Sequence, residues 1–427
     1  MNECRLLLFE LGDPVGHQLG YIQHLIDYWL ANGVAGGLDI VVTPAWLDLH
    51  VEFVASCSRY HCRGIRLHSI SSVDGRRLER WRGSLLLWSL VQGRILAKSL
   101  DEFVPDDCLL MSFDHLQPSL SLGLQARHPV RLHGLYFRPM LDRSVYGKGN
   151  TRAELIWRKS LLKRSLRNPS LRTLFCLDPW SIPYIEKLTS RVSVIALPDP
   201  VREYSERADP VHLRRRLGVE TGRKLMLFFG ELSRRKGTFQ LLESLRLLSP
   251  ADAKRLTVLM AGPIPAADRS LIRSRANRLK NVNICQLIIE DRFVPDHEIQ
   301  NLFNASDLVI APYQHHIGMS AVLVRAAMAR KPIIGPNHGV LAALIRGQRL
   351  GLAVDTSSPV KIANAIGYCL SRPSEELFDR ASAIAFAEFN RPEKFTATIF
   401  GRLFDGSEGI SSMSGNTRTA SQCAFFT

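Results

Sequence analysis

The amino-acid sequence predicts an α/β protein made of two Rossmann-like domains that face a cleft. Three observations support this prediction. The chain has 427 residues, a length that suggests two domains or three. Short apolar runs alternate with amphipathic segments of helical length, which is typical of βα units and a parallel sheet. A polar, charged stretch at Asp199–Lys224 divides this pattern into two series of similar size.

In the first series, seven apolar runs predict strands, and a helix from about His17 to Leu30 follows the first of them. The strands are expected at Arg5–Phe9, Leu38–Val42, Gly64–His68, Cys108–Phe113, Val130–Tyr136, Thr173–Leu177 and Val192–Ala196. Because ligands bind outside the carboxyl ends of the strands in such sheets, the residues directly after strands are the first candidates for a site.

The second series predicts six strands with helices between them. The strands are expected at Leu225–Phe229, Leu256–Ala261, Val282–Leu287, Leu308–Ala311, Pro332–Ile334 and Leu350–Val354. The helices are expected at about Thr238–Leu248, Ala266–Leu279, Asp296–Phe303, Val322–Ala329, Pro359–Leu370 and Ser374–Glu388.

These series define the expected domains. The first domain spans residues 1–203, and a linker with a short helix at Pro210–Leu217 spans residues 204–222. The second domain spans residues 223–390, followed by a C-terminal segment at 391–406. Residues 407–427 are rich in Ser, Gly and Thr, which predicts a disordered tail.

Composition predicts a soluble protein of a reducing compartment. The chain is 46% hydrophobic and 22% charged, within the ordinary globular range. Its eight cysteines are scattered without a CxxC pair, which argues against a disulfide framework or a structural zinc. The N-terminus lacks the features of a signal peptide. The longest apolar patch, Leu85–Val91, is far too short to span a bilayer. We therefore expect a cytoplasmic protein.

The formal net charge of +15 leaves three kinds of partner open: nucleic acid, an anionic membrane surface and phosphorylated substrates. Basic residues concentrate at Gly75–Arg82, Arg158–Arg167 and Arg214–Arg216 without any nucleic-acid motif, so no nucleic-acid partner is predicted. For Ala153–Arg167, two interpretations stand. It is an amphipathic basic helix on acidic lipid or, the favoured interpretation, a solvated helix face.

The segment Leu225–Gly237 (LMLFFGELSRRKG) is the first candidate for a ligand-binding site. An apolar strand runs into Gly230 and a polar loop, then into Lys236, Gly237 and a helix. Free amides at a helix start, with cations beside them, form a natural phosphate site. Arg234, Arg235 and Lys236 would supply the positive charge. Taken alone, this segment is explained equally well as an ordinary βα turn with basic surface residues. It does not contain a Walker loop.

The segment Asp307–Gly335 offers a second such helix start. A buried strand ends near Pro312, and a loop with His315 and His316 leads to a helix beginning near Ser320, a plausible N-cap. Two anion-binding helix starts side by side suit a diphosphate. The two histidines are better explained as surface loop residues than as metal ligands, because no Asp, Glu or Cys cluster is near them.

Together these segments resemble the retaining glycosyltransferases of family 4, which have the GT-B fold. GELSRRKG, LTVLMAGP, FNASDLVIAPY and GMSAVLVRAAMARKPII occur in the order and spacing of that family's motifs and cover nearly the whole second half. The resemblance implies that a nucleoside-diphosphate-sugar donor is bound in this half. The implied donor-binding residues are Gly230, Arg235, Lys236, Gly237, His316, Gly318, Met319, Ser320 and Arg325.

The chain departs from the family pattern at three positions. Ile317 and Arg325 stand where the family has two glutamates, and Glu231 stands where it has an arginine. In the family, the first glutamate usually contacts the donor sugar and the second usually holds the ribose. Arg325 cannot accept hydrogen bonds from ribose hydroxyls, but it can pair with a phosphate.

The first half resembles the same family more faintly, and the resemblance implies that it holds the acceptor. His115, in MSFDHLQP, is expected to follow the fourth strand and to contact the donor sugar, with Asp114 orienting it or acting as a base. Alternatively, Asp114 caps a turn and His115 is a satisfied loop residue. Gly16, His17 and Arg138 are the expected acceptor-side residues, although a surface ion pair explains Arg138 equally well.

The sequence thus predicts a hexosyltransferase-like glycosyltransferase acting on a glycan or lipid acceptor, by family analogy in polysaccharide biosynthesis. No Asp-x-Asp motif occurs, so metal independence is expected, with no cofactor beyond the donor co-substrate. The basic balance suits an acceptor at the membrane face or an anionic glycan, so we expect a cytoplasmic enzyme, with a peripheral position at the inner membrane face as one option. The alternative is a non-catalytic, glycosyltransferase-like binding protein, which Ile317 and Arg325 favour.

Overall fold

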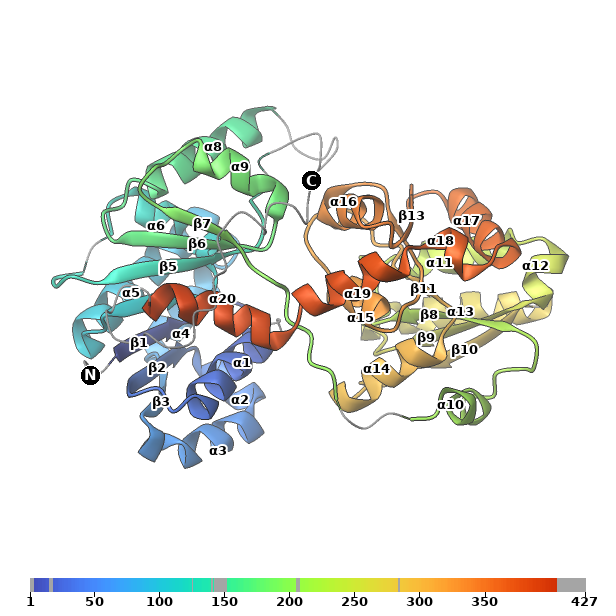
Figure 1. Cartoon of the computed structure of the whole chain (residues 1–427), viewed down its shortest axis with the longest axis horizontal. Helices are drawn as coiled ribbons and strands as arrows, with labels where there is room; N and C mark the ends of the chain where they lie inside the picture. Colours follow the sequence, from blue (N-terminus) through green and yellow to red (C-terminus); the bar gives the residue numbers. More distant parts are fainter. Residues whose placement is uncertain are drawn as a thin grey trace. The chain divides into compact units, whose positions relative to one another are not determined.

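The computed structural model describes residues 4–14, 18–124, 126–139, 141, 152–204, 208–282 and 285–404 (Figure 1). The described chain divides into two compact units. Residues up to Pro198, together with those from Pro392 onward, form the N-terminal unit. Asp199–Arg391 form the C-terminal unit, so the chain passes from one unit to the other at Pro198 and again at Pro392.

The N-terminal unit contains a seven-stranded parallel sheet with the order β3-β2-β1-β4-β5-β6-β7. Its strands are β1 (Cys4–Phe9), β2 (Gly36–Val42), β3 (Ile65–Ser69), β4 (Asp107–Leu110), β5 (Arg131–Tyr136), β6 (Leu171–Cys176) and β7 (Ser193–Ala196). The order reverses between β1 and β4, so the crevice at their carboxyl ends is the place where ligands bind in sheets of this kind.

Helices cover both faces of this sheet, as an all-parallel sheet requires. One face packs against α1 (Gln18–Ala31), α2 (Pro44–Leu49), α3 (Val51–Arg59) and α20 (Pro392–Phe404). The other packs against α4 (Ser72–Trp81), α5 (Leu85–Phe103), α6 (Phe113–Ser121), α8 (Arg152–Ser165) and α9 (Ile182–Glu186). The last helix thus returns to the first unit (Figure 1). There, Phe400 stacks on Tyr28 of α1 at a ring distance of 4.4 Å.

The C-terminal unit contains a six-stranded parallel sheet with the order β10-β9-β8-β11-β12-β13. Its strands are β8 (Lys224–Phe229), β9 (Leu256–Ala261), β10 (Gln286–Glu290), β11 (Leu308–Ile310), β12 (Ile333–Pro336) and β13 (Gly351–Val354). Here the order reverses between β8 and β11. The crevice of this sheet therefore lies where Gly230 and Pro312 follow their strands.

In this unit, helices precede β8, connect each pair of successive strands and follow β13. They are α10 (Pro210–Arg216), α11 (Thr238–Arg246), α12 (Pro250–Lys254), α13 (Ala266–Val282), α14 (Asp296–Ala305), α15 (Ala321–Met328), α16 (Gly339–Gly347), α17 (Pro359–Ser371), α18 (Ser374–Leu377) and α19 (Arg380–Phe389). Apolar side chains of α11, α13 and α17 cover one face of the sheet and form its core with β8, β9 and β11.

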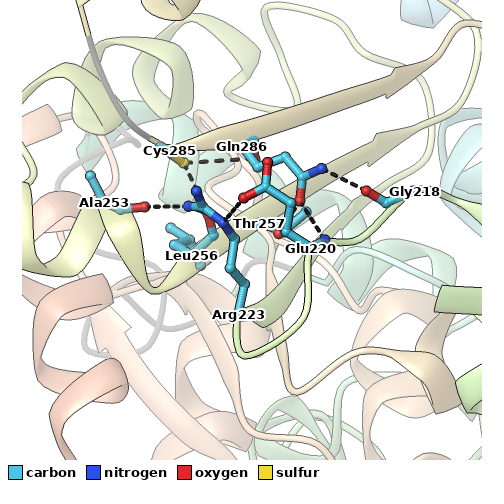
Figure 2. Close-up of polar contacts among 8 residues, drawn as sticks. All are labelled: Gly218, Glu220, Arg223, Ala253, Leu256, Thr257, Cys285 and Gln286. Atoms are coloured by element: carbon cyan, nitrogen blue, oxygen red, sulfur yellow. Dashed lines mark hydrogen bonds and ion pairs between the residues drawn. The ribbon is translucent and has the colours of Figure 1, made fainter. Parts of the chain in front are cut away.

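A polar network fixes the segment before β8 to the amino ends of the neighbouring strands (Figure 2). Arg223 donates to the carbonyl oxygens of Ala253 and Leu256 and pairs with Glu220 at 2.6 Å. The Gln286 side chain at the start of β10 accepts from the Glu220 amide and donates to the Gly218 carbonyl. These contacts lie at the opposite edge of the sheet from the crevice, so they set the position of β8 without occupying the site.

The predicted fold class of two Rossmann-like α/β units is confirmed, while several predicted element bounds are wrong. The strand expected at Cys108–Phe113 ends at Leu110, and Phe113 begins α6. The helix expected to end at Leu279 continues to Val282, so β10 begins four residues later than predicted. The helix expected at Ser374–Glu388 is two helices, because Asp379 caps a new one by accepting from the Ser382 amide at 2.9 Å.

Among the described residues, no helix combines the length and the apolar character that crossing a membrane requires.

Candidate functional site

The crevice of the C-terminal sheet brings the two predicted helix starts together. Gly230 leaves β8 with a φ of 105°, and its amide donates to the Ala261 carbonyl at 3.0 Å. Gly237 then begins α11 with a φ of 84°, a conformation that favours glycine. A Cβ added to Gly237 would lie 1.9 Å from the Pro312 carbonyl oxygen. The absence of a side chain at Gly237 therefore allows the start of α11 to approach the end of β11.

Lys236 connects these two turns. Its ammonium donates to the Tyr313 hydroxyl at 2.8 Å and lies 4.1 Å from the centre of that ring. A Cβ built on Gly230 would be 3.7 Å from the Lys236 Nζ, so the ammonium also lies close to the turn after β8. The Tyr313 hydroxyl in turn lies 3.2 Å from the Ser320 Oγ, at the start of α15. We refer to Gly230, Lys236, Tyr313 and Ser320 as the Lys236 cluster.

The hydrogen-bond directions in this cluster leave donors for a ligand on both Lys236, which uses one of its three ammonium hydrogens on Tyr313, and Ser320. Lys236 can only donate, so the Tyr313 oxygen accepts from it. Either hydroxyl can donate in the hydrogen bond between Tyr313 and Ser320, and we assign the buried Tyr313 as the donor because its hydrogen then has an acceptor. The Ser320 oxygen also accepts from the Val322 amide at 3.3 Å, as an N-cap does. Both lone pairs of that oxygen are then used. The Ser320 hydroxyl hydrogen remains as a donor for an anion.

The remaining residues predicted on the donor side lie around this cluster. The His316 ring packs edge-on against Tyr313 at 5.0 Å, and its Nε2 lies 3.1 Å from the Met319 carbonyl oxygen. A Cβ on Gly318 would meet nothing within 4 Å, so the turn before Ser320 borders open space. The Arg235 side chain is exposed. Arg234, by contrast, is held by Asp268 at 2.9 Å and by the Phe239 ring, so its charge is already engaged.

Arg325 lies in α15 beside Asp296 and Tyr204. Burial lowers the pKa of Arg325, and the charges of Asp296 and Tyr204 oppose that effect. Among the residues that the structure describes, the buried Nη1 of Arg325 has no hydrogen-bond partner. Ile317, at the other divergent position, is half-buried, and its carbonyl accepts from the Val340 amide at 2.9 Å.

In the N-terminal unit, Asp114 has a different set of contacts from those predicted for it. Its carboxylate accepts from the amides of Phe137 and Arg138, each at 2.9 Å. It thereby fastens the segment after β5 to the first turn of α6. This role differs both from orienting His115 and from capping the following turn. The Arg138 side chain is exposed, and Gly16 and His17 lie outside the described residues.

His115 lies in the first turn of α6. Because β4 ends at Leu110 and not at the predicted Phe113, His115 lies three residues farther from the end of the strand than predicted. Its ring packs on Trp88 of α5 at 4.6 Å. Burial lowers the pKa of His115, the Asp114 carboxylate acts in the opposite direction, and Arg138 lowers it further. The buried Nδ1 has no hydrogen-bond partner within the described part of the chain. A neutral imidazole with an unused ring nitrogen therefore lies near the crevice of this sheet.

Glu10 is a residue that the sequence reasoning missed. It directly follows β1 at the point where the strand order reverses, and its side chain is 1% exposed. Its two carboxyl oxygens accept from the Gly12 amide and from the Ser112 hydroxyl, the latter at 3.1 Å. Burial raises the pKa of Glu10 to about 7, although both hydrogen bonds act to lower it. The sequence feature that could have identified Glu10 is its position directly after the first apolar run.

The stability of the N-terminal unit should therefore depend on the ionisation of Glu10. Between pH 4.5 and about 7 the folded state retains a proton that the unfolded state releases, so stability falls as pH rises through this window. The shift corresponds to about 3 kcal/mol. In Glu10→Gln, the amide oxygen can accept from Gly12 and the NH2 can donate to the Ser112 hydroxyl without titrating, so this fall should disappear. Chemical unfolding of both proteins across this pH window measures the difference.

The exposed Glu79→Gln is the matched control, because it also removes one carboxyl from the N-terminal unit. A constant difference in stability between the wild type and Glu10→Gln at every pH would show that Glu10 does not titrate there.

In the described chain, no group of three or more His, Cys, Asp or Glu side chains is placed to hold a metal ion.

Comparison with known proteins supports the resemblance for the second half of the chain. Residues 223–372 match the family model described as Glycosyl transferases group 1. The chain is 27% identical over 154 residues to YtcC, a putative glycosyltransferase of Bacillus subtilis, and 25% identical over 186 residues to the D-inositol 3-phosphate glycosyltransferase of Frankia alni. These matches cover 36% and 43% of this chain. The chain spans less than half the length of these curated relatives, 38% and 45% respectively.

Solved structures match over nearly the whole chain. An α,α-trehalose-phosphate synthase (UDP-forming) from Burkholderia vietnamiensis has a TM-score of 0.65 at 14% identity, covering 97% of this chain and all of that one. HepE from Anabaena, solved in complex with UDP, has a TM-score of 0.63 at 16% identity, covering 94% and 99%. At these identities the likeness establishes the fold. The predicted GT-B fold and the predicted resemblance to group 1 glycosyltransferases are both confirmed.

Proposed function

We propose that this chain is a glycosyltransferase that transfers a sugar from a nucleoside-diphosphate sugar to a glycan or lipid acceptor. The observation that carries the proposal is the Lys236 cluster at the crevice of the C-terminal sheet, inside the segment that matches the family model. A fixed ammonium, a free serine hydroxyl hydrogen and two helix starts form a site for a doubly charged anion. The UDP in the similar HepE structure is consistent with this ligand class.

Bond cleavage in such a transfer leaves a nucleoside diphosphate, whose charge must be stabilised. Lys236 supplies a positive charge, and the amino ends of α11 and α15 supply partial positive charge. Fixed donors of this kind need no reorganisation as negative charge develops on the leaving oxygen. We therefore propose a metal-independent reaction without a further cofactor.

We assign the acceptor to the N-terminal unit. His115 is held neutral by burial and retains an unused ring nitrogen, so it can donate to or accept from a sugar hydroxyl. Glu10 lies at the crevice of the same sheet with a pKa near neutrality, where a carboxyl can exchange a proton. By analogy with the family, we place the reaction in polysaccharide biosynthesis in the cytoplasm.

A thermal-shift panel of nucleoside diphosphates and nucleotide sugars tests the proposed ligand class. At a ligand concentration of a hundred times the dissociation constant, binding should stabilise the folded state by about 2.7 kcal/mol, which is visible as a higher Tm. A nucleoside diphosphate and its sugar conjugate should stabilise the chain, whereas the free nucleoside should not. If no nucleoside diphosphate raises the Tm, the proposal fails.

A binding protein without turnover is the second candidate, and Ile317 and Arg325 favour it. These residues replace the two glutamates of the family motif, and no carboxylate takes their place in the sequence there. Slow hydrolysis of the donor separates the two functions. In an enzyme, water attacks the sugar carbon and the nucleoside diphosphate leaves. A binding protein would show the thermal shift without this release.

A further inference from the structure

The turn between α4 and α5 exposes an unusual group of large apolar side chains. Trp81 is 36% exposed, and Leu85, Leu86 and Leu87 are 39%, 53% and 37% exposed. They lie within seven consecutive residues, at the end of one helix and the first turn of the next. Single exposed apolar residues are ordinary on a protein surface, but a contiguous group indicates an interaction site.

Arginines accompany these apolar side chains. Leu78 is the buried residue of α4, so the exposed Arg76 and Arg80 lie on its solvent side. The Arg80 guanidinium lies 5.3 Å from the centre of the Trp81 ring. We refer to Arg76, Arg80, Trp81, Leu85, Leu86 and Leu87 as the α4–α5 tip.

The positive charge of the tip is not neutralised by the carboxylates that the structure describes. The nearby acids are already paired, Asp74 with Arg77 at 3.4 Å and Glu79 with Arg82 at 3.7 Å. In the part of the chain that the structure describes, no carboxylate lies within ion-pair distance of Arg76 or Arg80. The tip thus presents apolar side chains together with unpaired cations.

The tip adjoins the crevice assigned to the acceptor. Trp88, one residue beyond the three leucines, packs on His115. Arg82, in the turn itself, pairs with Asp13 at 2.7 Å, and Asp13 lies in the loop that follows β1. A surface bound at the tip would therefore lie next to the carboxyl ends of β1 and β4.

We propose that the α4–α5 tip docks this protein on an anionic lipid bilayer. Leucine side chains enter the boundary of the acyl region, and tryptophan favours the interface, where its apolar ring and N–H both find suitable surroundings. Arginines beside them pair with lipid phosphates. This arrangement fits a bilayer better than a protein partner, because the exposed cations and the exposed apolar side chains lie together within residues 76–87.

The basic helix α8 is a weaker candidate for the same role. Its Ile156 and Trp157 are exposed. However, the basic residues next to them are engaged, since Arg158 pairs with Glu154 at 3.0 Å and Lys159 lies over the Tyr184 ring at 4.4 Å. The proposal therefore places lipid contact at the tip, and lipid contact through α8 is an alternative result that the experiment can distinguish.

Co-sedimentation of the full chain with vesicles tests the proposal without donor or acceptor, so its result is separate from that of the proposed function. We expect binding to phosphatidylcholine vesicles that contain phosphatidylglycerol, little binding to pure phosphatidylcholine, and weaker binding as salt is raised. Leu86→Glu should lose most of the bound fraction, whereas Leu122→Glu, at a leucine that is 69% exposed at the end of α6, should bind like the wild type. Arg80→Gln should weaken binding about fivefold, and Arg127→Gln should not.

Far-UV circular dichroism and a thermal melt of each variant confirm that it is folded. Quenching of Trp81 fluorescence by brominated lipid, taken as the difference between the wild type and Trp81→Phe, gives a second readout that does not depend on the leucine variants. Absence of binding to anionic vesicles would overturn the proposal. So would loss of binding in Ile156→Glu with binding retained in Leu86→Glu, or lipid-free self-association that Leu86→Glu abolishes.

Discussion

Replacing Lys236 by alanine should lower both donor turnover and diphosphate affinity by about a hundredfold, because it removes the one ammonium of the Lys236 cluster. Lys236→Met should have nearly the same effect, since it keeps an apolar stem over the Tyr313 ring but carries no charge. Release of nucleoside diphosphate without acceptor measures turnover, and titration calorimetry measures affinity. Both variants should remain folded, because the change lies at a half-buried side chain in the crevice.

Lys254→Ala is the matched control for these variants. Lys254 is an exposed lysine at the end of α12, on the amino side of β9 and away from the crevice. It changes the net charge by the same amount, so it should leave turnover and affinity at wild-type levels. If Lys236→Ala behaved like Lys254→Ala in both assays, the cluster would have no part in holding the donor.

Gly237→Ala should destabilise the C-terminal unit by about 3 kcal/mol or more. The added methyl group would lie 1.9 Å from the Pro312 carbonyl oxygen, and the positive φ is unfavourable for alanine as well. To accommodate it, the start of α11 must move away from the end of β11. Diphosphate affinity should fall in the same variant, because this movement separates Lys236 from Tyr313. Chemical unfolding and calorimetry give the two values.

Gly218→Ala separates the two causes. Gly218 also has a positive φ, of 73°, but a Cβ there meets nothing within 4 Å. It should therefore cost only about 1 kcal/mol, the cost of the backbone conformation alone. Equal losses of stability in the two variants would mean that the close approach of Gly237 to Pro312 does not restrict the residue at that position.

Much of the fold was predictable because parallel strands buried on both faces are continuous apolar runs. The run at Leu225–Phe229 became β8, and Leu308–Ala311 became β11, each within one residue at its ends. The prediction failed where apolar character continued past a strand. Met111 and Phe113 are both buried, but Phe113 begins a helix, and apolar character alone does not distinguish a buried strand from a buried helix start. Sequence also left residues 391–406 unassigned, although Phe395 and Phe400 are buried in the N-terminal core.

The turns that form the site were predictable from the sequence, but the side chains that contact them were not. Gly230, Lys236 and Ser320 were expected from helix starts that follow strands, and the structure brings them together. Tyr313 could not be identified in advance, because its role depends on the distance between its hydroxyl and two other elements. Glu10 was overlooked for a similar reason, since only the fold shows that it is buried beside Ser112. The hydrogen-bond partners of Asp114 were also not predictable, because they are backbone amides from a distant strand end.

Hydrogen–deuterium exchange with and without the nucleoside diphosphate that most raises the Tm is the most direct test of the account. Added nucleotide should slow the exchange of backbone amides in residues 231–238 and in residues 318–324, at the starts of α11 and α15, because these amides face the anion. Protection confined to other segments, or no protection in either of these two, would contradict the claim that the turns after β8 and β11 jointly hold a diphosphate.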